Sequence, residues 1–259
     1  GGAKNMLVVM EDADLTVFRD NYLNSCYGSA GQRCLAGSLV AAVPEIYDKV
    51  VEVMVEAAST IKVGDAFDLD VYMGPLISRK AVDFVHTSLA AALAHGQGCA
   101  LALDRRELDL PEKNKKGFFV GPIIVKDLTP CNPLFTTEVF GPIVGTIKIA
   151  DMDDALDLIR RSEFGNGACI FTQSQFYAEK FSREADVGMV GVNVGICAPH
   201  PYIPFGGIKG SLLGVNKVQG REGFDFFTQN KVTTIRTIDP HAHAHGGAPA
   251  SKFVRSCVA

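Results

Sequence analysis

The sequence predicts an α/β fold in which a mostly parallel β-sheet carries helices on both faces. Two observations predict it. Short apolar runs alternate with longer amphipathic segments through most of the 259 residues, and alternation of this kind produces βαβ units. The chain is also long enough to bury a sizeable core, since 47% of its residues are hydrophobic.

The first elements follow from local patterns. Residues 6–9, "MLVV", are a short apolar run followed by "EDAD", which is typical of a buried strand that leads into a helix start. The helix is expected to run to about Ser29 and to end in a hinge at Ala30 and Gly31. "LVAAV" at residues 39–43 is expected to be a second buried strand.

Two amphipathic helices are predicted next. Residues 46–61 place their apolar side chains on one helical face despite several valines. The segment from Arg79 to about Ala94 repeats this pattern and stops at His95 and Gly96, where glycine suits a helix end.

The alternation then continues towards the carboxyl end. Asp151 is placed to cap a helix that ends near Gly165. The other elements predicted here are strands at 99–104, 122–125, 168–172 and 188–194 and a helix at 175–185. From residue 224 the pattern changes to "FDFFTQNKVTTIRT", a late β segment, and "HAHAHGGAPASK" after it is typical of a disordered tail.

Composition excludes several classes of function. The formal charge is −4 without a basic stripe, so nucleic acid is not an expected partner. No apolar run approaches the ~18–20 residues that cross a bilayer, so no membrane anchor is expected. The seven cysteines are odd in number and form no CxxC pair, which argues against a disulfide framework or a zinc site. We expect a soluble protein of a reducing compartment, mitochondrial or cytoplasmic, and no metal at the histidines in the tail.

The stretch "GSAGQRCLAGS" at residues 28–38 sets Cys34 among small residues and directly after Arg33. A reactive thiol needs access and surroundings that lower its pKa, and both are compatible with this stretch. The alternative interpretation is a tight helix-to-strand turn with a buried thiol.

Two further stretches are candidate binding elements. In "TTEVFGPIV" the carboxylate of Glu138 and the ring of Phe140 are expected to project together, so that one accepts hydrogen bonds from a sugar diol while the other covers a flat heterocycle. Phe205 begins the glycine-rich segment "PFGGIKG". Each stretch alone has an alternative interpretation. Glu138 could be a solvated carboxylate beside a core Phe140, and Phe205 could be a core residue in a glycine-rich surface loop.

Taken together, these segments resemble the aldehyde dehydrogenase superfamily. The motifs are "GAKN", "GQRC", "EVFGP", "FGNGACIFT", "GVNV" and "PFGG" leading to "GREGFDFFTQNK", and they occur in the family's order between about residues 2 and 236. The sequence "GAKN", the sequence "GQRC" and the long spacer before "GREG" are most similar to the CoA-acylating branch that acts on methylmalonate semialdehyde.

The resemblance implies a role for each candidate. Cys34 is similar to the catalytic thiol that attacks the aldehyde and becomes a thioester when hydride leaves to NAD. Glu138 matches the residue that binds the nicotinamide ribose, and Phe140 matches the ring beside the nicotinamide. Phe205 matches an aromatic wall of the aldehyde pocket, and Arg33 flanks that pocket, where a semialdehyde carboxylate could be held.

The resemblance also implies an organisation. Residues 1–223 match the catalytic domain, residues 224–238 an oligomerisation strand of a dimer or tetramer, and residues 239–259 a disordered tail. The dinucleotide-binding portion that precedes these residues in the family is expected as a partner, and without it the chain is expected to be inactive. The general-base position falls before Gly1, so coenzyme A as acyl acceptor and water, which would give a free acid, both stay open. A non-catalytic module that keeps the fold is the third alternative.

Overall fold

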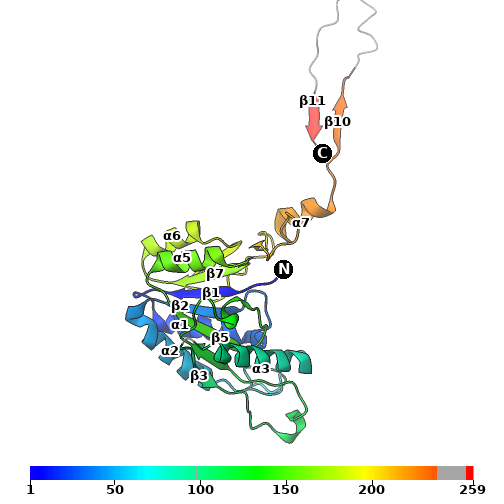
Figure 1. Cartoon of the computed structure of the whole chain (residues 1–259). Coiled ribbons are helices and arrows are strands. Elements are labelled where there is room, and N and C mark those ends of the chain that lie inside the picture. Colours follow the sequence, from blue (N-terminus) through cyan, green and yellow to red (C-terminus); the bar gives the residue numbers. More distant parts are fainter. Residues whose placement is uncertain (97, 238–254, 259) are drawn as a thin grey trace, which may run out of the picture.

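The computed structural model of the chain describes residues 1–96, 98–237 and 255–258. Its body is organised around a seven-stranded sheet in the order β3-β4-β5-β2-β1-β7-β8 (Figure 1). The strands of this sheet are β1 Asn5–Val9, β2 Gly37–Ala42, β3 Ala100–Asp104, β4 Ile123–Lys126, β5 Ile143–Lys148, β7 Gly167–Phe171 and β8 Met189–Val192. Every pairing within it is parallel except that of the edge strand β3 with β4.

The helices begin where the sequence places capping residues. Asp14, Ser78, Asp151 and Ser174 each accept a hydrogen bond from a backbone N–H of the helix that follows, which satisfies part of the unpaired first turn. The helices are α1 Leu15–Tyr27, α2 Pro44–Ser59, α3 Arg79–Ala94, α4 Pro133–Thr136, α5 Met152–Arg161, α6 Gln175–Glu184 and α7 Gly220–Phe227, with short 3-10 turns at Gly28–Gly31 and Glu112–Asn114.

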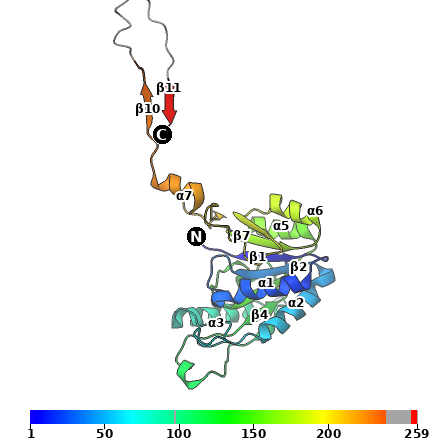
Figure 2. The same cartoon turned by 180° about the vertical axis from the view of Figure 1, so that it is seen from behind.

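Helices cover both faces of the sheet. On one face, α1 and α2 lie in front of the strands in Figure 2, and the ring of Phe18 in α1 packs edge-on against Phe171 in β7 at 5.2 Å between centroids. On the other face, Leu158 and Ile159 of α5 line a pocket with Met6 of β1 and Leu39 of β2. Within β7, Ala168 lines the same pocket while Phe171 packs on α1, so an odd spacing along the strand places the two residues on opposite faces. The predicted fold class is confirmed.

The carboxyl-terminal part differs from the sequence prediction. The expected late β segment begins with helix α7, and only β10, Val232–Ile235, is a strand there. Arg221 and Asp225 form an ion pair at the i,i+4 spacing of a helix, with 3.6 Å between the charged atoms, which adds modestly to the stability of the helical turn. The expected boundary between residues 223 and 224 therefore lies inside α7.

The tail prediction also needs a partial correction. Residues 255–258, inside the segment expected to be disordered, form strand β11, which pairs antiparallel with β10. Backbone hydrogen bonding to β10 gives these residues a regular partner that their composition did not indicate. Residues 239–254 and 259 lie outside the described residues. Figures 1 and 2 show α7, β10 and β11 extending away from the body.

A second small sheet lies beside the start of the chain. Strand β6, Phe164–Gly165, pairs antiparallel with β9, Ile208–Lys209, and the Ser211 hydroxyl donates to the Gly2 carbonyl at 2.6 Å. The glycine-rich segment is thereby fixed next to residues 1–5. Among the helices that the structure describes, none has the length and apolar character needed to cross a bilayer.

Candidate active site

The turn that carries Cys34 has an unusual backbone. After α1, Ser29, Ala30 and Gly31 have φ angles of 53°, 55° and 72°, in the left-handed region that residues other than glycine rarely occupy. Such conformations persist where the surrounding structure imposes them and are concentrated at functional sites. The predicted hinge is present, and Cys34 at its end is exposed rather than buried.

Two asparagine side chains hold the main chain of Cys34. The Cys34 carbonyl accepts hydrogen bonds from Asn5 Nδ2 at 2.9 Å and from Asn166 Nδ2 at 2.8 Å. Asn5 Nδ2 also donates to the Ala36 carbonyl at 2.9 Å, and Asn5 Oδ1 accepts from the Gly167 N–H at 3.1 Å. The thiol therefore stands on an exposed turn whose backbone is anchored to the centre of the sheet.

The loop that carries Glu138 and Phe140 lies against this turn. A Cβ added at Gly31 would stand 2.4 Å from the Gly141 carbonyl oxygen, so the two backbones approach as closely as only glycine allows. A small pocket at this approach is lined by Asn5, Arg33, Glu138 and Phe140, among others. The structure thus brings together three stretches of the sequence, those of Asn5, of Arg33 and of Glu138 with Phe140. The third lies more than a hundred residues after the first two.

Glu138 and Phe140 are both partly exposed. Burial raises the pKa of Glu138, and a hydrogen bond from the Ala3 backbone and the charge of Lys4 oppose this rise. The Phe140 ring is 46% exposed. Its backbone is left-handed, with a φ of 58°. A half-buried carboxylate beside a half-exposed ring gives one polar and one flat apolar surface on the same loop.

Arg33 makes contacts that the sequence did not indicate. Its Nη2 donates to the Asn24 carbonyl at 2.8 Å and its Nε to the Gly28 carbonyl at 3.1 Å. The guanidinium thus binds carbonyl oxygens at the carboxyl end of α1, where a cation is favoured. No hydrogen bond within the described residues uses Arg33 Nη1.

Phe205 lies apart from the other candidates in the contacts that the structure describes. It is half-buried, and its carbonyl accepts a hydrogen bond from the Val218 N–H at 2.9 Å. This bond ties the start of the glycine-rich segment to residues that precede α7. No described contact joins Phe205 to Cys34, so its place in an aldehyde pocket stays a prediction.

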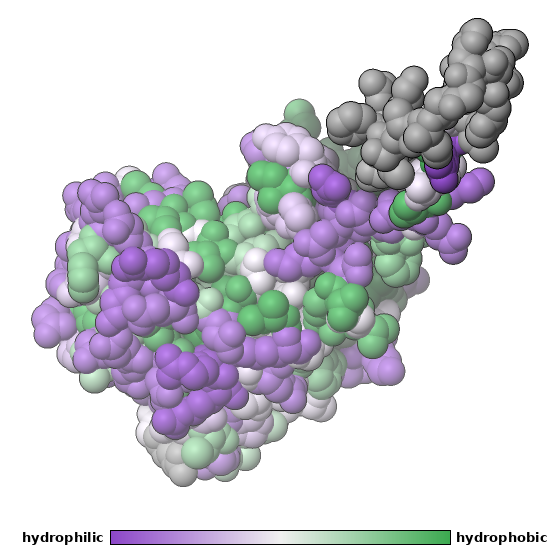
Figure 3. All heavy atoms as spheres, turned by 90° about the horizontal axis from the view of Figure 1, so that it is seen from above, coloured by the Kyte–Doolittle hydropathy of each residue, from purple (hydrophilic) through white to green (hydrophobic). Residues whose placement is uncertain are grey.

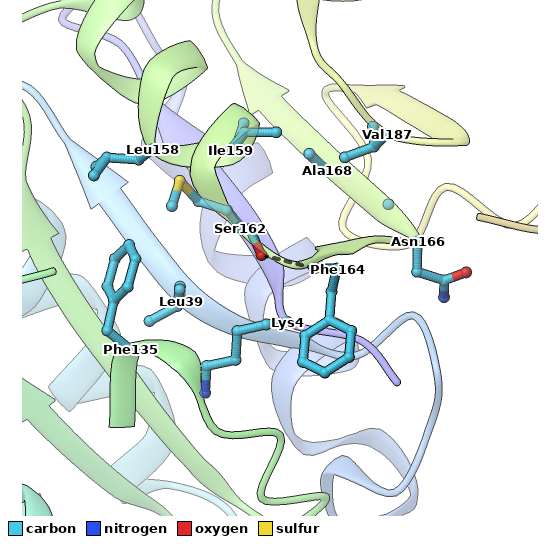
Figure 4. A pocket seen from close by; sticks show the side chains of 12 residues that line it. Lys4, Leu39, Phe135, Leu158, Ile159, Ser162, Phe164, Asn166, Ala168 and Val187 are labelled. Atoms are coloured by element: carbon cyan, nitrogen blue, oxygen red, sulfur yellow. Dashed lines mark hydrogen bonds between the residues drawn. The ribbon is translucent and has the colours of Figure 1, made fainter. Parts of the chain in front are cut away.

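Lys4 is a buried amine that sequence reasoning did not single out. Its side chain extends between Phe135 and Phe164 in a pocket below α5 (Figure 4). Only 8% of the residue is exposed, and Nζ has no hydrogen-bond partner among the described residues. Burial lowers the pKa of Lys4 to about 7, and Glu138 acts in the opposite direction.

Comparison with known proteins identifies the family. The model of the aldehyde dehydrogenase family matches residues 1–233. The chain belongs to the aldehyde dehydrogenase family. The resemblance inferred from the motifs is therefore confirmed.

Named relatives are similar over nearly the whole chain. Malonate-semialdehyde dehydrogenase 2 of Geobacillus thermodenitrificans is 40% identical over 235 residues, which cover 91% of this chain and 48% of the relative. Malonate-semialdehyde dehydrogenase 3 of Geobacillus kaustophilus is 38% identical with the same coverage. The chain spans about half the length of the curated relatives it matches.

Solved structures with a similar fold also come from the aldehyde dehydrogenase family. Methylmalonate-semialdehyde dehydrogenase of Oceanimonas doudoroffii has a TM-score of 0.88 and 37% identity, covering 92% of this chain and 49% of that one. A putative methylmalonate-semialdehyde dehydrogenase of Sinorhizobium meliloti, solved with NAD, also has a TM-score of 0.88, with 32% identity and coverage of 92% and 48%.

Three residues of this site were not assigned a role from the sequence: Lys4, Asn5 and Asn166. Each lies within or beside a motif that carried the family resemblance. The signal that could have found them is polarity, because "AKNMLVV" and "GNGACIF" place polar side chains at the start of otherwise apolar buried strands.

Proposed function

We propose that this chain provides the nucleophile and the nicotinamide-facing residues of an NAD-dependent dehydrogenase for a malonate- or methylmalonate-type semialdehyde. The observation that carries the proposal is the close approach of Gly31 to Gly141, which sets the exposed Cys34 turn beside the loop of Glu138 and Phe140. The names of the relatives and of the solved structures support the substrate class. The rest of the cofactor site is expected in the half of the relatives that this chain does not span.

Cys34 performs the covalent step. Its thiolate forms a C–S bond to the aldehyde carbon, and the carbonyl π electrons move onto oxygen. Within the described residues the Cys34 N–H has no acceptor, so it is free to donate to the developing oxyanion. When the oxyanion collapses, hydride leaves the carbon and Cys34 is left as a thioester.

The residues beside Cys34 fit the nicotinamide end of NAD. When bound, NAD supplies the hydride acceptor. The Glu138 carboxylate can accept hydrogen bonds from a ribose diol, and the exposed part of the Phe140 ring offers a flat apolar surface for a planar heterocycle. These roles use only groups that line the pocket at the Gly31 turn.

Coenzyme A is the proposed acyl acceptor. Its thiolate would attack the thioester carbonyl, form the new C–S bond and release the Cys34 thiolate. The resemblance of "GAKN" and "GQRC" to the CoA-acylating branch supports this choice. Water in the same place would give a free acid, and the product distinguishes the two reactions.

The test uses the full-length protein with malonate semialdehyde, NAD and coenzyme A. We expect reduced cofactor by absorbance, acyl-CoA by mass spectrometry, and complete loss of both in Cys34→Ala. Cys131→Ala is the matched control, because Cys131 is also exposed but lies on the loop before α4. Turnover that survives in Cys34→Ala would overturn the proposal, and free acid in the presence of coenzyme A would replace acyl transfer by hydrolysis.

A further inference from the structure

The two asparagines that contact Cys34 come from neighbouring strands of the sheet. Asn5 is the first residue of β1, and Asn166 precedes β7, which pairs with β1 through Met6 and Ala168. On its other side β1 pairs with β2, and Asn5 is opposite Gly37 there. The turn of Cys34 leads into β2, so three adjacent strands meet at the Cys34 carbonyl.

The register is irregular at this end of the sheet. Asn5 pairs with Gly37 but Met6 pairs with Leu39, so Ser38 is skipped in the ladder between β1 and β2. Bulges of this type occur beside active sites, where they redirect a side chain. Here the bulge brings the Asn5 amide within reach of two carbonyls, those of Cys34 and Ala36.

Both peptide groups that flank Cys34 are fixed. The carbonyl of Cys34 has two lone pairs, and Asn5 and Asn166 occupy both. On the other side, the Arg33 carbonyl accepts the Ala36 N–H at 3.0 Å, which orients the peptide group that carries the Cys34 N–H. Rotation about χ1 is then the main freedom left to the thiol.

We propose that Asn5 and Asn166 are positioning residues for Cys34, which hold its N–H and its Sγ in the relative orientation that attack on a carbonyl requires. Both asparagines are buried, with 5% and 7% of their surfaces exposed, so their amides are shielded from water and directed at the Cys34 carbonyl. The inference rests on the proposed role of Cys34 as nucleophile. An oxyanion donor works only when it is preorganised.

Asn166 is the better residue for a test. Within the described residues its amide makes one hydrogen bond, to Cys34, whereas Asn5 also holds Ala36 and Gly167, so its replacement removes several bonds between β1 and its neighbours at once. Asn132→Ala is the matched control. Asn132 is also buried, with 1% of its surface exposed, and its Nδ2 donates to a main-chain carbonyl, that of Ala92, at 3.0 Å. Its Oδ1 in addition accepts from the Leu134 N–H at the start of α4, so its loss should cost at least as much stability as that of Asn166.

The experiment compares Asn166→Ala, Asn132→Ala and wild type in the full-length protein. For Asn166→Ala we expect kcat per folded molecule to fall about 10- to 100-fold with little change in KM, as for loss of alignment in the transition state. Hydrogen exchange of peptides that contain residues 33–36 should rise. Iodoacetamide labelling of Cys34 should stay within about twofold, since alkylation requires an accessible thiolate but no oxyanion donor.

Each alternative gives a different pattern. If the asparagine is only structural, both variants lose thermal stability while kcat per folded molecule stays within about threefold of wild type, and the inference is overturned. Partial recovery of kcat in Asn166→Gln, which keeps an amide donor, would support it. Failure of the proposed function is a separate result, because turnover would then persist in Cys34→Ala.

Discussion

Burial separates the cysteines of this chain into unequal chemical classes. Cys34 and Cys131 are exposed, while Cys26 and Cys169 are buried. Burial raises the pKa of Cys26, and a hydrogen bond with Cys197 together with burial raises the pKa of Cys169. Only a thiolate reacts with an alkylating reagent, so the surroundings of a cysteine determine its rate.

We therefore expect limiting iodoacetamide to label Cys34 and Cys131 at least about 100-fold faster than Cys26 and Cys169. Peptide mapping of the folded chain measures the order, and labelling in denaturant is the control, because all thiols should then react alike. Early labelling of Cys26 or Cys169 with Cys34 unlabelled would contradict both the burial pattern and the role of Cys34.

Arg33 tests the substrate class. The expected role of Arg33 is a hydrogen bond from its guanidinium to the carboxylate of the semialdehyde. Because losing such a charge-assisted bond costs about 1.5–3 kcal/mol, Arg33→Leu should lower kcat/KM for malonate semialdehyde roughly 10- to 150-fold in the full-length protein. Propanal has no carboxylate and should be affected far less. Equal losses for both substrates would mean that Arg33 acts only through its bonds to Asn24 and Gly28.

Lys4 gives the stability a pH dependence of defined sign. Its pKa is lowered from 10.5 to about 7 by burial. Between these values the unfolded chain binds more protons than the folded one, so this residue makes stability rise with pH across that window. The folded state tolerates the neutral amine better than the ammonium.

We expect the free energy of unfolding of wild type, relative to Lys4→Met, to increase by about 2 kcal/mol between about pH 7 and about pH 9. Urea unfolding of this chain at both pH values measures it. The comparison with Lys4→Met cancels the contribution of the other titratable groups, including the cysteines, whose thiols ionise within this range in the unfolded chain. A difference that is constant with pH would mean that Lys4 is charged and solvated in the folded chain.

At the scale of elements, the sequence predicted the strand and helix alternation because each element carries its own period and cap. The helix from Arg79 to Ala94 has the predicted bounds. The arrangement of residues around Cys34 could not be predicted from the sequence, because it depends on the order of the strands in the sheet. Asn5, Cys34 and Asn166 meet only because β1 lies between β2 and β7, and no local pattern gives that order. The pairing of β11 with β10 likewise depends on partners 20 to 26 residues away.

The Gly31 turn supplies a sharp test at this scale. Gly31→Ala would place a methyl group 2.4 Å from the Gly141 carbonyl, whereas a methyl group at Gly96, which has the same φ of 72°, has nothing within 4 Å. Gly96→Ala should cost about 1 kcal/mol from the left-handed backbone alone. Gly31→Ala should cost at least about 2 kcal/mol more, since the two loops must separate.

Denaturant unfolding of the two variants measures this difference. In the full-length protein, Gly31→Ala should also weaken NAD binding, because the loop of Glu138 and Phe140 is displaced from Cys34. Equal stabilities for Gly31→Ala and Gly96→Ala would show that the loops do not need their close approach.

At the scale of the whole molecule, the described body has a continuous core, but its extension does not pack on it. In α7, Phe224 and Phe227 are 69% and 86% exposed, and in β10 Val232 and Ile235 are 75% and 61% exposed. Hydrophobic residues also appear at the surface of the body and of the extension in Figure 3. Apolar side chains gathered on one projecting segment are typical of a contact surface.

This extension should make the chain self-associate. Within the described residues strand β10 pairs with β11 on one side only, so its other edge has unpaired N–H and carbonyl groups there beside exposed apolar side chains. Such an edge accepts a strand from another molecule. By sedimentation velocity, we expect the mass of residues 1–259 to increase with concentration. A chain that ends at Phe227 should be a monomer. This end point keeps the hydrogen bond from the Lys217 N–H to Glu222. Ile235→Lys is the control of unchanged length, because a charge on the edge should also suppress association. If all three are equally monomeric, the extension is not an association surface, and the oligomerisation role expected for residues 224–238 would have to be given up.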